Sequence, residues 1–475
     1  MTKTYRLCCA LGQNIAQYYF GKEKVMKQFM KRLVFALAVT LSVLGMKQSV
    51  FAENIIHVNK TTFPDDAFRK AVLQSWFYET NGFLEDIIWQ YGDNIEIDAD
   101  QMFELFVASD LKNSKITNLK GIELLTKLES ISMPNYYGSK FDLSSNTELR
   151  DVYICSKKYA LSPNDFSCLK ELTGLKLSGK IASNFNCSDL NNLTRLSIFA
   201  TSDIKRLDIS RCKMLKVLSV EADSLESVNL GDTSSIEYID ISRAKGLSSI
   251  DVSKHANLQM LCLEDCNIKK LDVSNNKKLK NLFLNGNKML KSLDVKDNNS
   301  LYKVNIGSTS ISKLDTSNLK NLRYFQANNT KLSSLDLRNN TKLEELEVAN
   351  TPLKKLDVTK IKKLKNINIA RSKIKSINLK NQKELYGLTY SYGQKISYLS
   401  KFPGNYFWIN IKDIKKGGSI AVPSICKGYK FSSDKEYSLK YKNNKIITSK
   451  KTKKKYAYAS FVKGKKSIAF RMEYK

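Results

Sequence analysis

The sequence predicts an α/β solenoid in which short parallel strands stack into one sheet, and three observations carry that prediction. Leucine or isoleucine recurs in one frame from Leu128 to Leu385, in twelve intervals of 21 to 23 residues. A second apolar pair, with a polar residue between its members, stands in the other half of most intervals. The pattern is lost before residue 105 and after residue 385. Spacing held over this length indicates a repeat protein of about 13 turns.

The first half of each interval predicts a short strand with one buried face. Its apolar residues stand two apart, as Leu261 and Leu263 do, which is the period of a strand. A small polar residue at the ninth position is expected to hydrogen-bond the backbone where the chain leaves the strand, because buried amides need partners. These ladder residues are Cys266, Asn287, Thr309, Thr330, Thr351 and Ser372.

The second half of each interval predicts a return segment on the other side of the coil. An aspartate stands between two apolar residues in Leu271-Asp272-Val273 and again in Leu356-Asp357-Val358. We expect these aspartates to be structural and to face water. A single repeat buries too little surface to fold alone, so the repeats must stack and both ends of the stack need covers.

The frame L-x-x-L-x-L-x-x-(N/C/T/S)-x-L resembles the leucine-rich repeat over residues 105–385. The chain is similar to the internalin-like class of secreted bacterial proteins. That resemblance implies a curved, right-handed superhelix with a parallel sheet on its concave face. It also implies a binding protein, secreted or associated with the cell wall, that recognises a protein or glycan at the cell surface, with adhesion to host tissue as one role. It transfers none of the contact residues.

Residues 1–52 predict an amino-terminal extension and a secretory signal peptide. Basic residues at positions 27–32 precede an apolar run from Leu33 to Met46, and Val50-Phe51-Ala52 supplies a cleavage site before Glu53. The alternative is a membrane anchor. Fourteen helical residues extend only about 21 Å, whereas the hydrocarbon core is roughly 30 Å thick. We therefore expect no transmembrane span after cleavage; translation from Met1, Met26 or Met30 stays open.

Residues 53–104 predict a helical cap on the first repeat. Pro64, Asp65 and Asp66 suit the first turn of a helix, and Phe68, Val72 and Leu73 form its apolar stripe. The motif Phe63-Pro64-Asp65 with Phe68-Arg69 resembles the amino-terminal cap of secreted leucine-rich-repeat proteins of Gram-positive bacteria. In those proteins a loop resembling a calcium-binding loop follows. Residues 79–82 and 93–98 lack the alternating oxygen ligands of such a loop, so calcium binding is not expected.

Residues 386–475 predict a small antiparallel β domain with a strongly basic surface. Ile468, Phe470 and Met472 alternate with polar or small residues, and Asn443-Asn444 suits a hairpin turn. Residues 411–475 hold 19 Lys or Arg and 4 Asp or Glu, in a chain of net charge +32. This surface either keeps the protein soluble or binds an anionic cell-wall polymer. Lysines expected to bind such a polymer are Lys451, Lys453, Lys454, Lys455, Lys463, Lys465 and Lys466.

The residues that carry catalysis, cofactors or metals are sparse. The two histidines, His57 and His255, stand in no catalytic motif, and no phosphate-binding glycine loop occurs. Seven cysteines follow the predicted cleavage site, an odd number without C-x-x-C spacing. Most are expected to be reduced, with a disulfide among Cys155, Cys168 and Cys187 left open. We predict no enzyme activity, no cofactor, no metal site and no nucleic-acid partner.

The strand residues that face away from the core predict a ligand-binding patch on the concave face. Neighbouring strands lie about 4.8 Å apart, so residues at matching positions of successive repeats are neighbours. Exposed aromatic residues beside arginine are typical of protein-binding surfaces. Single exposed aromatic residues are also ordinary, so the patch depends on the chosen frame. Its predicted members are Tyr238, Met260, Phe283, Tyr302 and Tyr324, with Lys280, Lys303 and Arg323 beside them.

Two other function classes stay open. The protein could be a structural component of the cell envelope, held to an anionic wall by its basic carboxy-terminal domain alone. It could also be an enzyme whose site no motif reveals. The sequence does not distinguish ligands or oligomeric states.

Overall fold

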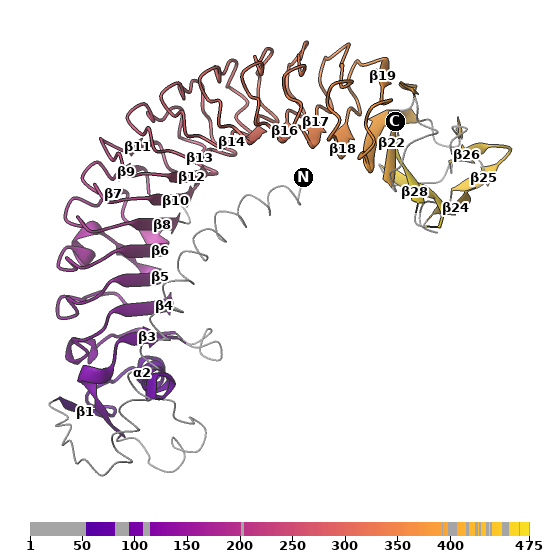
Figure 1. The fold of residues 1–475 in the computed structure, drawn as a ribbon. Helices are drawn as coiled ribbons and strands as arrows, with labels where there is room; N and C mark the ends of the chain where they lie inside the picture. The colour runs from indigo at the N-terminus through magenta and orange to yellow at the C-terminus, as the bar shows by residue number, and fades with distance from the viewer. Residues whose placement is uncertain are drawn as a thin grey trace, which may run out of the picture. The chain divides into compact units, whose positions relative to one another are not determined.

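The computed structural model describes residues 54–80, 95–107, 115–200, 204–391, 393–397, 406–414, 418–422, 426, 429–433, 437, 439–448, 456–464 and 466–474. The predicted signal peptide lies outside these residues. The chain divides into two compact units, Met1–Ile241 (the first unit) and Ser242–Lys475 (the second unit). Within each unit the strands run side by side, and most pair in parallel (Figure 1). The chain forms a β-solenoid of about 13 turns with little helix, as the leucine spacing predicts.

A helix lies where the sequence places the amino-terminal one. Helix α2 (Asp66–Thr80) begins with the Asp65 carboxylate accepting the N–H of Phe68 at 2.9 Å. Its stripe of Phe68, Val72 and Leu73 is buried. The Ser75 hydroxyl accepts the N–H of Phe106, 2.9 Å away, which fixes the helix against strand β3 (Glu104–Phe106). The helix is thus present, and its role as a cap stays a prediction.

The first unit contains strands of the main parallel sheet and two smaller sheets. Val152, Leu175, Leu196 and Leu218 face one another in register on successive strands and are buried. The strands after β3 are β4 (Ser130–Tyr136), β5 (Asp151–Leu161), β6 (Gly174–Ile181), β8 (Arg195–Ala200), β10 (Val217–Ala222) and β12 (Tyr238–Ser242). One smaller sheet holds β7 (Asn184–Asn186), β9 (Arg206–Asp208) and β11 (Ser227–Asn229), and in the other β1 (Ile55–Val58) pairs with β2 (Ile95–Asp98). Short 3₁₀ turns are η1 (Ala99–Gln101), η2 (Ile122–Leu124) and η3 (Pro163–Phe166).

The second unit begins with strands of only three residues, one per coil. Their central residues form a buried row, whose members include Leu282, Val304, Phe325 and Leu346. The strands are β13 (Met260–Cys262), β14 (Asn281–Phe283), β15 (Lys303–Asn305), β16 (Tyr324–Gln326), β17 (Glu345–Glu347) and β18 (Asn366–Asn368). The register predicted from the sequence is confirmed for all six.

The parallel sheet continues beyond residue 385. Strand β18 pairs with β20 (Gly387–Ser391), β20 with β22 (Tyr406–Ile414), and β22 with β28 (Lys466–Tyr474), all in parallel. The aromatic segment that begins at Tyr406 is therefore a strand of the main sheet. Alternating apolar residues predict a strand, but they do not say which neighbour it pairs with.

Among the other carboxy-terminal pairs, β19 (Ser376–Asn378) with β21 (Lys395–Ser397) is parallel, and the rest are antiparallel, as the sequence predicts. The antiparallel pairs include β28 with β27 (Tyr456–Lys463) and β27 with β24 (Lys430–Ser433). Ile468, Phe470 and Met472 are buried, which confirms the alternation. Asn443 and Asn444 have φ of 50° and 55°, the left-handed pair that a two-residue hairpin needs, and they connect β25 (Lys440–Lys442) to β26 (Lys445–Ile447). The other strand is β23 (Ser419–Ala421).

The polar ladder at the ninth position of the repeat is present. The Thr309 hydroxyl donates to the carbonyl of Ile306 at 2.7 Å, and Thr330 and Thr351 repeat this bond one and two coils later. The residue before the ladder position has positive φ in seven successive coils. This left-handed backbone conformation lets the chain turn at the end of the strand. Glycine adopts it most readily, yet six of the seven residues are not glycine. They are Arg243, Asp265, Gly286, Ser308, Asn329, Asn350 and Arg371.

A second ladder, which the sequence reading missed, lies on the side of the coils opposite the sheet (the turn side). The buried Asn340 amide donates to the carbonyls of Thr316 and Leu319 in the preceding coil, at 3.0 and 2.9 Å. Asn276 and Asn298 make equivalent pairs of bonds. Each of these amides supplies the donors that two buried carbonyls would otherwise lack.

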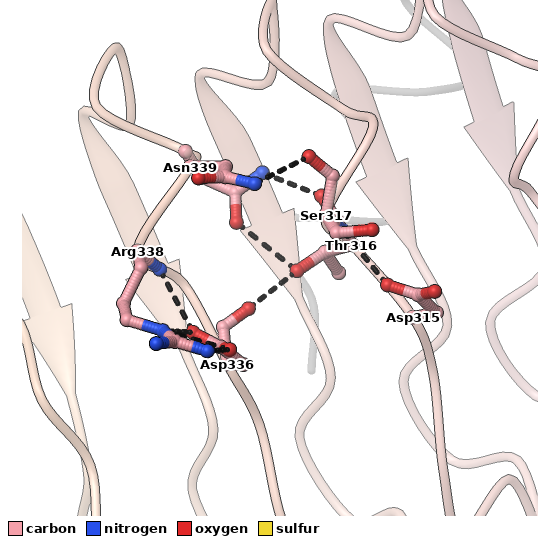
Figure 2. Close-up of polar contacts among 7 residues, drawn as sticks. Asp315, Thr316, Ser317, Asp336, Arg338 and Asn339 are labelled. Carbon is pink, nitrogen blue, oxygen red and sulfur yellow. Dashed lines mark hydrogen bonds and ion pairs between the residues drawn. The ribbon is translucent and has the colours of Figure 1, made fainter.

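The repeated aspartates of the turn side are exposed, as expected, and each also closes a turn. Asp315 accepts the N–H of Ser317 at 2.9 Å, and Asp336 accepts the N–H of Arg338 at 3.0 Å (Figure 2). These bonds lower the pKa of the Asp315 carboxyl and, with the Arg338 guanidinium, bring the pKa of Asp336 to about 2. The same bond recurs at Asp208, Asp251, Asp272, Asp294 and Asp357.

Candidate binding face

The outward face of the second unit's sheet carries two side chains from each three-residue strand. Pairing places Met260, Asn281, Lys303, Tyr324 and Glu345 in one row. It places Cys262, Phe283, Asn305, Gln326 and Glu347 in the other. Both rows place matching positions of successive repeats side by side, as the leucine frame predicts.

Two predicted members of the patch are buried, which corrects the expectation that they are exposed. Met260 is 4% exposed and Phe283 is 8% exposed. Strands about 4.8 Å apart bring long side chains of adjacent coils against one another, so a place on the outward face does not guarantee exposure. Next to them Asn305 is also buried, and its amide donates to Glu264 at 3.2 Å. The outward face around Met260 and Phe283 is therefore closely packed, and the Asn305 amide there is hydrogen-bonded within the protein.

Two other predicted members, Tyr238 and Lys280, have polar contacts of their own. Tyr238 belongs to the first unit, where its backbone N–H donates to the carbonyl of Lys216 at 3.0 Å. Lys280 is exposed, and its ammonium donates to Gln259 at 3.0 Å.

The remaining four predicted residues are brought together, and we call them the aromatic–basic cluster: Tyr302, Lys303, Arg323 and Tyr324. The two tyrosine rings lie 5.3 Å apart, centre to centre, and are tilted by 56°. The Lys303 ammonium lies 4.6 Å from the centre of the Tyr324 ring, and the Arg323 guanidinium lies 5.6 Å from that of Tyr302. Both cations are within the range of a cation–π interaction. The hydrogen bond between the Tyr324 and Tyr302 hydroxyls, together with burial, raises the pKa of Tyr324 to about 12.

Three glutamates follow the cluster on the next coil. Glu344 lies 2.8 Å from both the Arg323 guanidinium and the Lys365 ammonium, and these partners lower the pKa of its carboxyl. Glu345 is half-buried, and burial raises the pKa of its carboxyl. Glu347 accepts hydrogen bonds from the amides of Gln326 and Asn328. The face therefore changes from basic and aromatic to acidic within two coils.

Glu345 and Glu347 are additions to the predicted site. The predicted patch does not include them. A signal was present, because three glutamates within four residues are unusual in a chain with 78 Lys or Arg and 46 Asp or Glu. In the structure Glu344 is buried, whereas Glu345 and Glu347 are half-exposed on the outward face, and Glu345 lies directly beside Tyr324 of the cluster.

The predicted anionic-surface lysines lie largely outside the described residues. Lys451, Lys453, Lys454, Lys455 and Lys465 belong to the part that the structure does not describe. Lys463 is exposed at the end of β27, and Lys466 pairs with it at the start of β28. In addition, Lys440, Lys442 and Lys445 are exposed on the β25–β26 hairpin.

The seven cysteines after residue 52 are free thiols in the described chain, so the disulfide left open among Cys155, Cys168 and Cys187 is not formed. Cys187 and Cys212 are buried in neighbouring coils, and the Cys212 thiol donates to the Cys187 carbonyl at 3.3 Å. Of the helices that the structure describes, none is long and apolar enough to cross a membrane.

Comparison with solved structures identifies the fold. The functional domain of InlJ from Listeria monocytogenes, which includes a cysteine ladder, matches with a TM-score of 0.55 and 20% identity. The match covers 89% of this chain and 99% of that one. The fold is a leucine-rich-repeat solenoid. An internalin (inlF) from L. monocytogenes strain 4b F2365 matches with a TM-score of 0.51 and 15% identity, over 73% of this chain and 96% of the other.

The chain thus shares the leucine-rich-repeat fold of the internalins. Sequence identities of 15–20% show the fold and nothing about function. No protein-family model matches the chain, and no curated protein matches it. The function must therefore be argued from the residues of the outward face.

Proposed function

We propose that this leucine-rich-repeat protein is a binding protein that takes a protein ligand on the outward face of strands β15 to β17. The observation that supports this most is the aromatic–basic cluster, where two tyrosine rings in contact and two cations share one surface next to Glu345 and Glu347. Aromatic residues and arginine dominate the energetics of protein interfaces. Side chains of both charges beside them favour a partner with complementary charges.

A glycan is the alternative ligand on the same face, because tyrosine rings also stack on sugars and Glu, Gln and Asn bind hydroxyl groups. We favour a protein, since the Lys303 and Arg323 cations beside the tyrosine rings, together with the glutamates on the next coil, suit a partner that carries charges of both signs. The signal-peptide pattern of residues 1–52 supports a secreted or wall-associated location, and adhesion to host tissue is the role that the resemblance to internalins suggests.

The test is a pull-down from surface extracts with the wild type and with Tyr302→Ala/Tyr324→Ala. Partners are identified by mass spectrometry and their affinities are then measured with purified proteins. Loss of both rings should weaken binding by about 30-fold or more, which corresponds to about 2 kcal/mol for a pair of central aromatic residues. Asn339→Ala, on the exposed turn side, is the matched control and should bind like the wild type. Equal recovery of every partner by the double variant would remove the cluster from consideration.

A second candidate function is attachment to an anionic cell-wall polymer through the basic carboxy-terminal region. The exposed Lys440, Lys442 and Lys445 of the β25–β26 hairpin favour it. Deleting residues 411–475 would be a poor test, because β28 is part of the main sheet. The triple change of these lysines to glutamate leaves the sheet intact and should release the protein from cells. Moderate salt should do the same, since exposed charges are screened within about 8–10 Å; retention at about 1 M salt would contradict this function.

A further inference from the structure

A lysine of the first unit lies between two aromatic rings on the outward face of the sheet. The Lys176 ammonium, on β6, is 4.5 Å from the centre of the Tyr153 ring and 5.7 Å from that of the Phe199 ring. Tyr153 is its direct neighbour on β5. Phe199 stands two residues beyond Ser197, its direct neighbour on β8. The two rings flank the ammonium and exclude part of its water.

The charge of this ammonium is not balanced by the surrounding sheet. Burial lowers the pKa of Lys176, which means that the charged form loses solvation. Among the described residues, no carboxylate forms an ion pair or hydrogen bond with it. The rings compensate part of the loss, because their faces attract cations. A partly desolvated cation without a counterion can form a strong charge-assisted hydrogen bond with an anion that binds beside it.

An acidic group on the neighbouring strand β5 is already paired with another cation. Asp151 pairs with Arg195 at 2.8 Å, and Gly174 lies between them on the intervening strand. A side chain at position 174 would collide with the Asp151 carboxylate and crowd the Arg195 guanidinium. Glycine therefore allows Asp151 to reach past β6 to Arg195. Arg195 therefore has a carboxylate partner, whereas Lys176 on the intervening strand has none among the described residues.

We propose that Tyr153, Lys176 and Phe199 form a slot that binds a carboxylate side chain of an acidic, partly apolar protein segment. The positive charge favours an anion, and a carboxylate can accept a charge-assisted hydrogen bond from the ammonium. The Tyr153 and Phe199 rings are themselves half-exposed, so apolar side chains next to the carboxylate would also find contacts. The slot uses no residue of the aromatic–basic cluster and lies in the other compact unit, so it stands or fails independently of the proposed function.

The experiment measures fluorescence anisotropy of a labelled twelve-residue peptide of alternating Glu and Val against the full chain. A peptide with Gln in place of each Glu and an oligosaccharide of uronic acids are the comparison probes. The Glu peptide should bind, and Lys176→Gln should weaken it by about 10- to 100-fold, the effect of one charge-assisted hydrogen bond. Lys176→Arg should keep most of the affinity because it keeps the charge.

The matched control is Lys180→Gln, which removes an exposed lysine of the same strand and should change the affinity less than twofold. Protection of Lys176, but not of Lys180, from an amine-acylating reagent in the presence of the Glu peptide gives a second readout. The proposal is overturned if the Gln peptide binds the wild type equally well, or if Lys176→Gln binds like the wild type. It is also overturned if only the uronic-acid oligosaccharide binds, because the occupant would then be an acidic glycan.

Discussion

The two sides of the coils in the second unit contrast in what they repeat. On the turn side, Asp272, Asp315 and Asp357 accept the same backbone N–H, coil after coil. On the outward face of the sheet, Met260, Lys303, Tyr324 and Glu345 occupy one equivalent position and share no chemistry. Positions that stack coils must repeat, whereas positions that contact a ligand need not. The loss of repetition therefore marks the surface that is available for binding.

The largest expected loss of stability comes from a buried asparagine of the turn side and is compared with that of its exposed neighbour. Asn340→Ala should lower the free energy of unfolding by about 2–4 kcal/mol, because two buried carbonyls lose their donor and a cavity remains. The exposed Asn339 donates to the carbonyl of Ser317 at 3.1 Å (Figure 2), and Asn339→Ala should cost about 0.5 kcal/mol or less. Urea unfolding of both variants makes the measurement. Equal losses would mean that the buried ladder is not what joins the coils.

The next effect tests the left-handed turn residue. Ser308 has φ of 55°, which a β-branched side chain tolerates poorly. Ser308→Val should lower the free energy of unfolding by about 1–2 kcal/mol, and Ser308→Gly should leave it within about 0.5 kcal/mol of the wild type. The pair is compared by urea unfolding. A Val variant as stable as the Gly variant would show that the turn relaxes to another conformation.

A smaller effect contrasts adjacent glutamates of β17 through pH. The folded-state pKa of Glu344 is lowered, so its stabilisation is present above the unfolded pKa and lost as pH falls through the folded pKa. Glu344→Gln should thus cost about 1 kcal/mol at neutral pH, since Arg323 and Lys365 are 43% and 40% exposed, and the cost should vanish near pH 3.

The pKa of the neighbouring Glu345 carboxyl is shifted in the opposite direction. Its pKa is raised, so its contribution is present below the unfolded pKa and lost as pH rises through the folded pKa. Glu345→Gln should therefore be at least as stable as the wild type at pH 7. Thermal unfolding between pH 3 and pH 8 checks both variants, and parallel pH profiles for the two would refute the assignment.

The smallest effect is expected at Arg338. Its guanidinium lies against the Asp336 carboxylate, 2.7 Å away, but both groups are exposed to solvent (Figure 2). The turn itself depends on the backbone N–H of residue 338, which Arg338→Ala retains. Thermal unfolding should show no measurable change. A clear loss would mean that the exposed ion pair stabilises the turn.

Spacing alone predicts the buried rows and the strand register, because a period of two within a period of 21 to 23 leaves one way to stack the coils. It also predicts the hydrogen-bonding role of Thr309 and Thr330. It does not predict that Met260 and Phe283 are covered, because exposure depends on the side chains of neighbouring coils. Nor does it predict the parallel pairing of β22 with β28, which joins segments about 60 residues apart through non-local contacts.

The central claim is that repeated positions hold the fold together and the aromatic–basic cluster does not. The most direct test is the free energy of unfolding of Tyr302→Ala/Tyr324→Ala in urea. We predict a loss of no more than about 1.5 kcal/mol, because both rings are half-exposed and their mutual contact contributes little. A loss as large as that of Asn340→Ala would show that the tyrosines are part of the scaffold and would contradict the account.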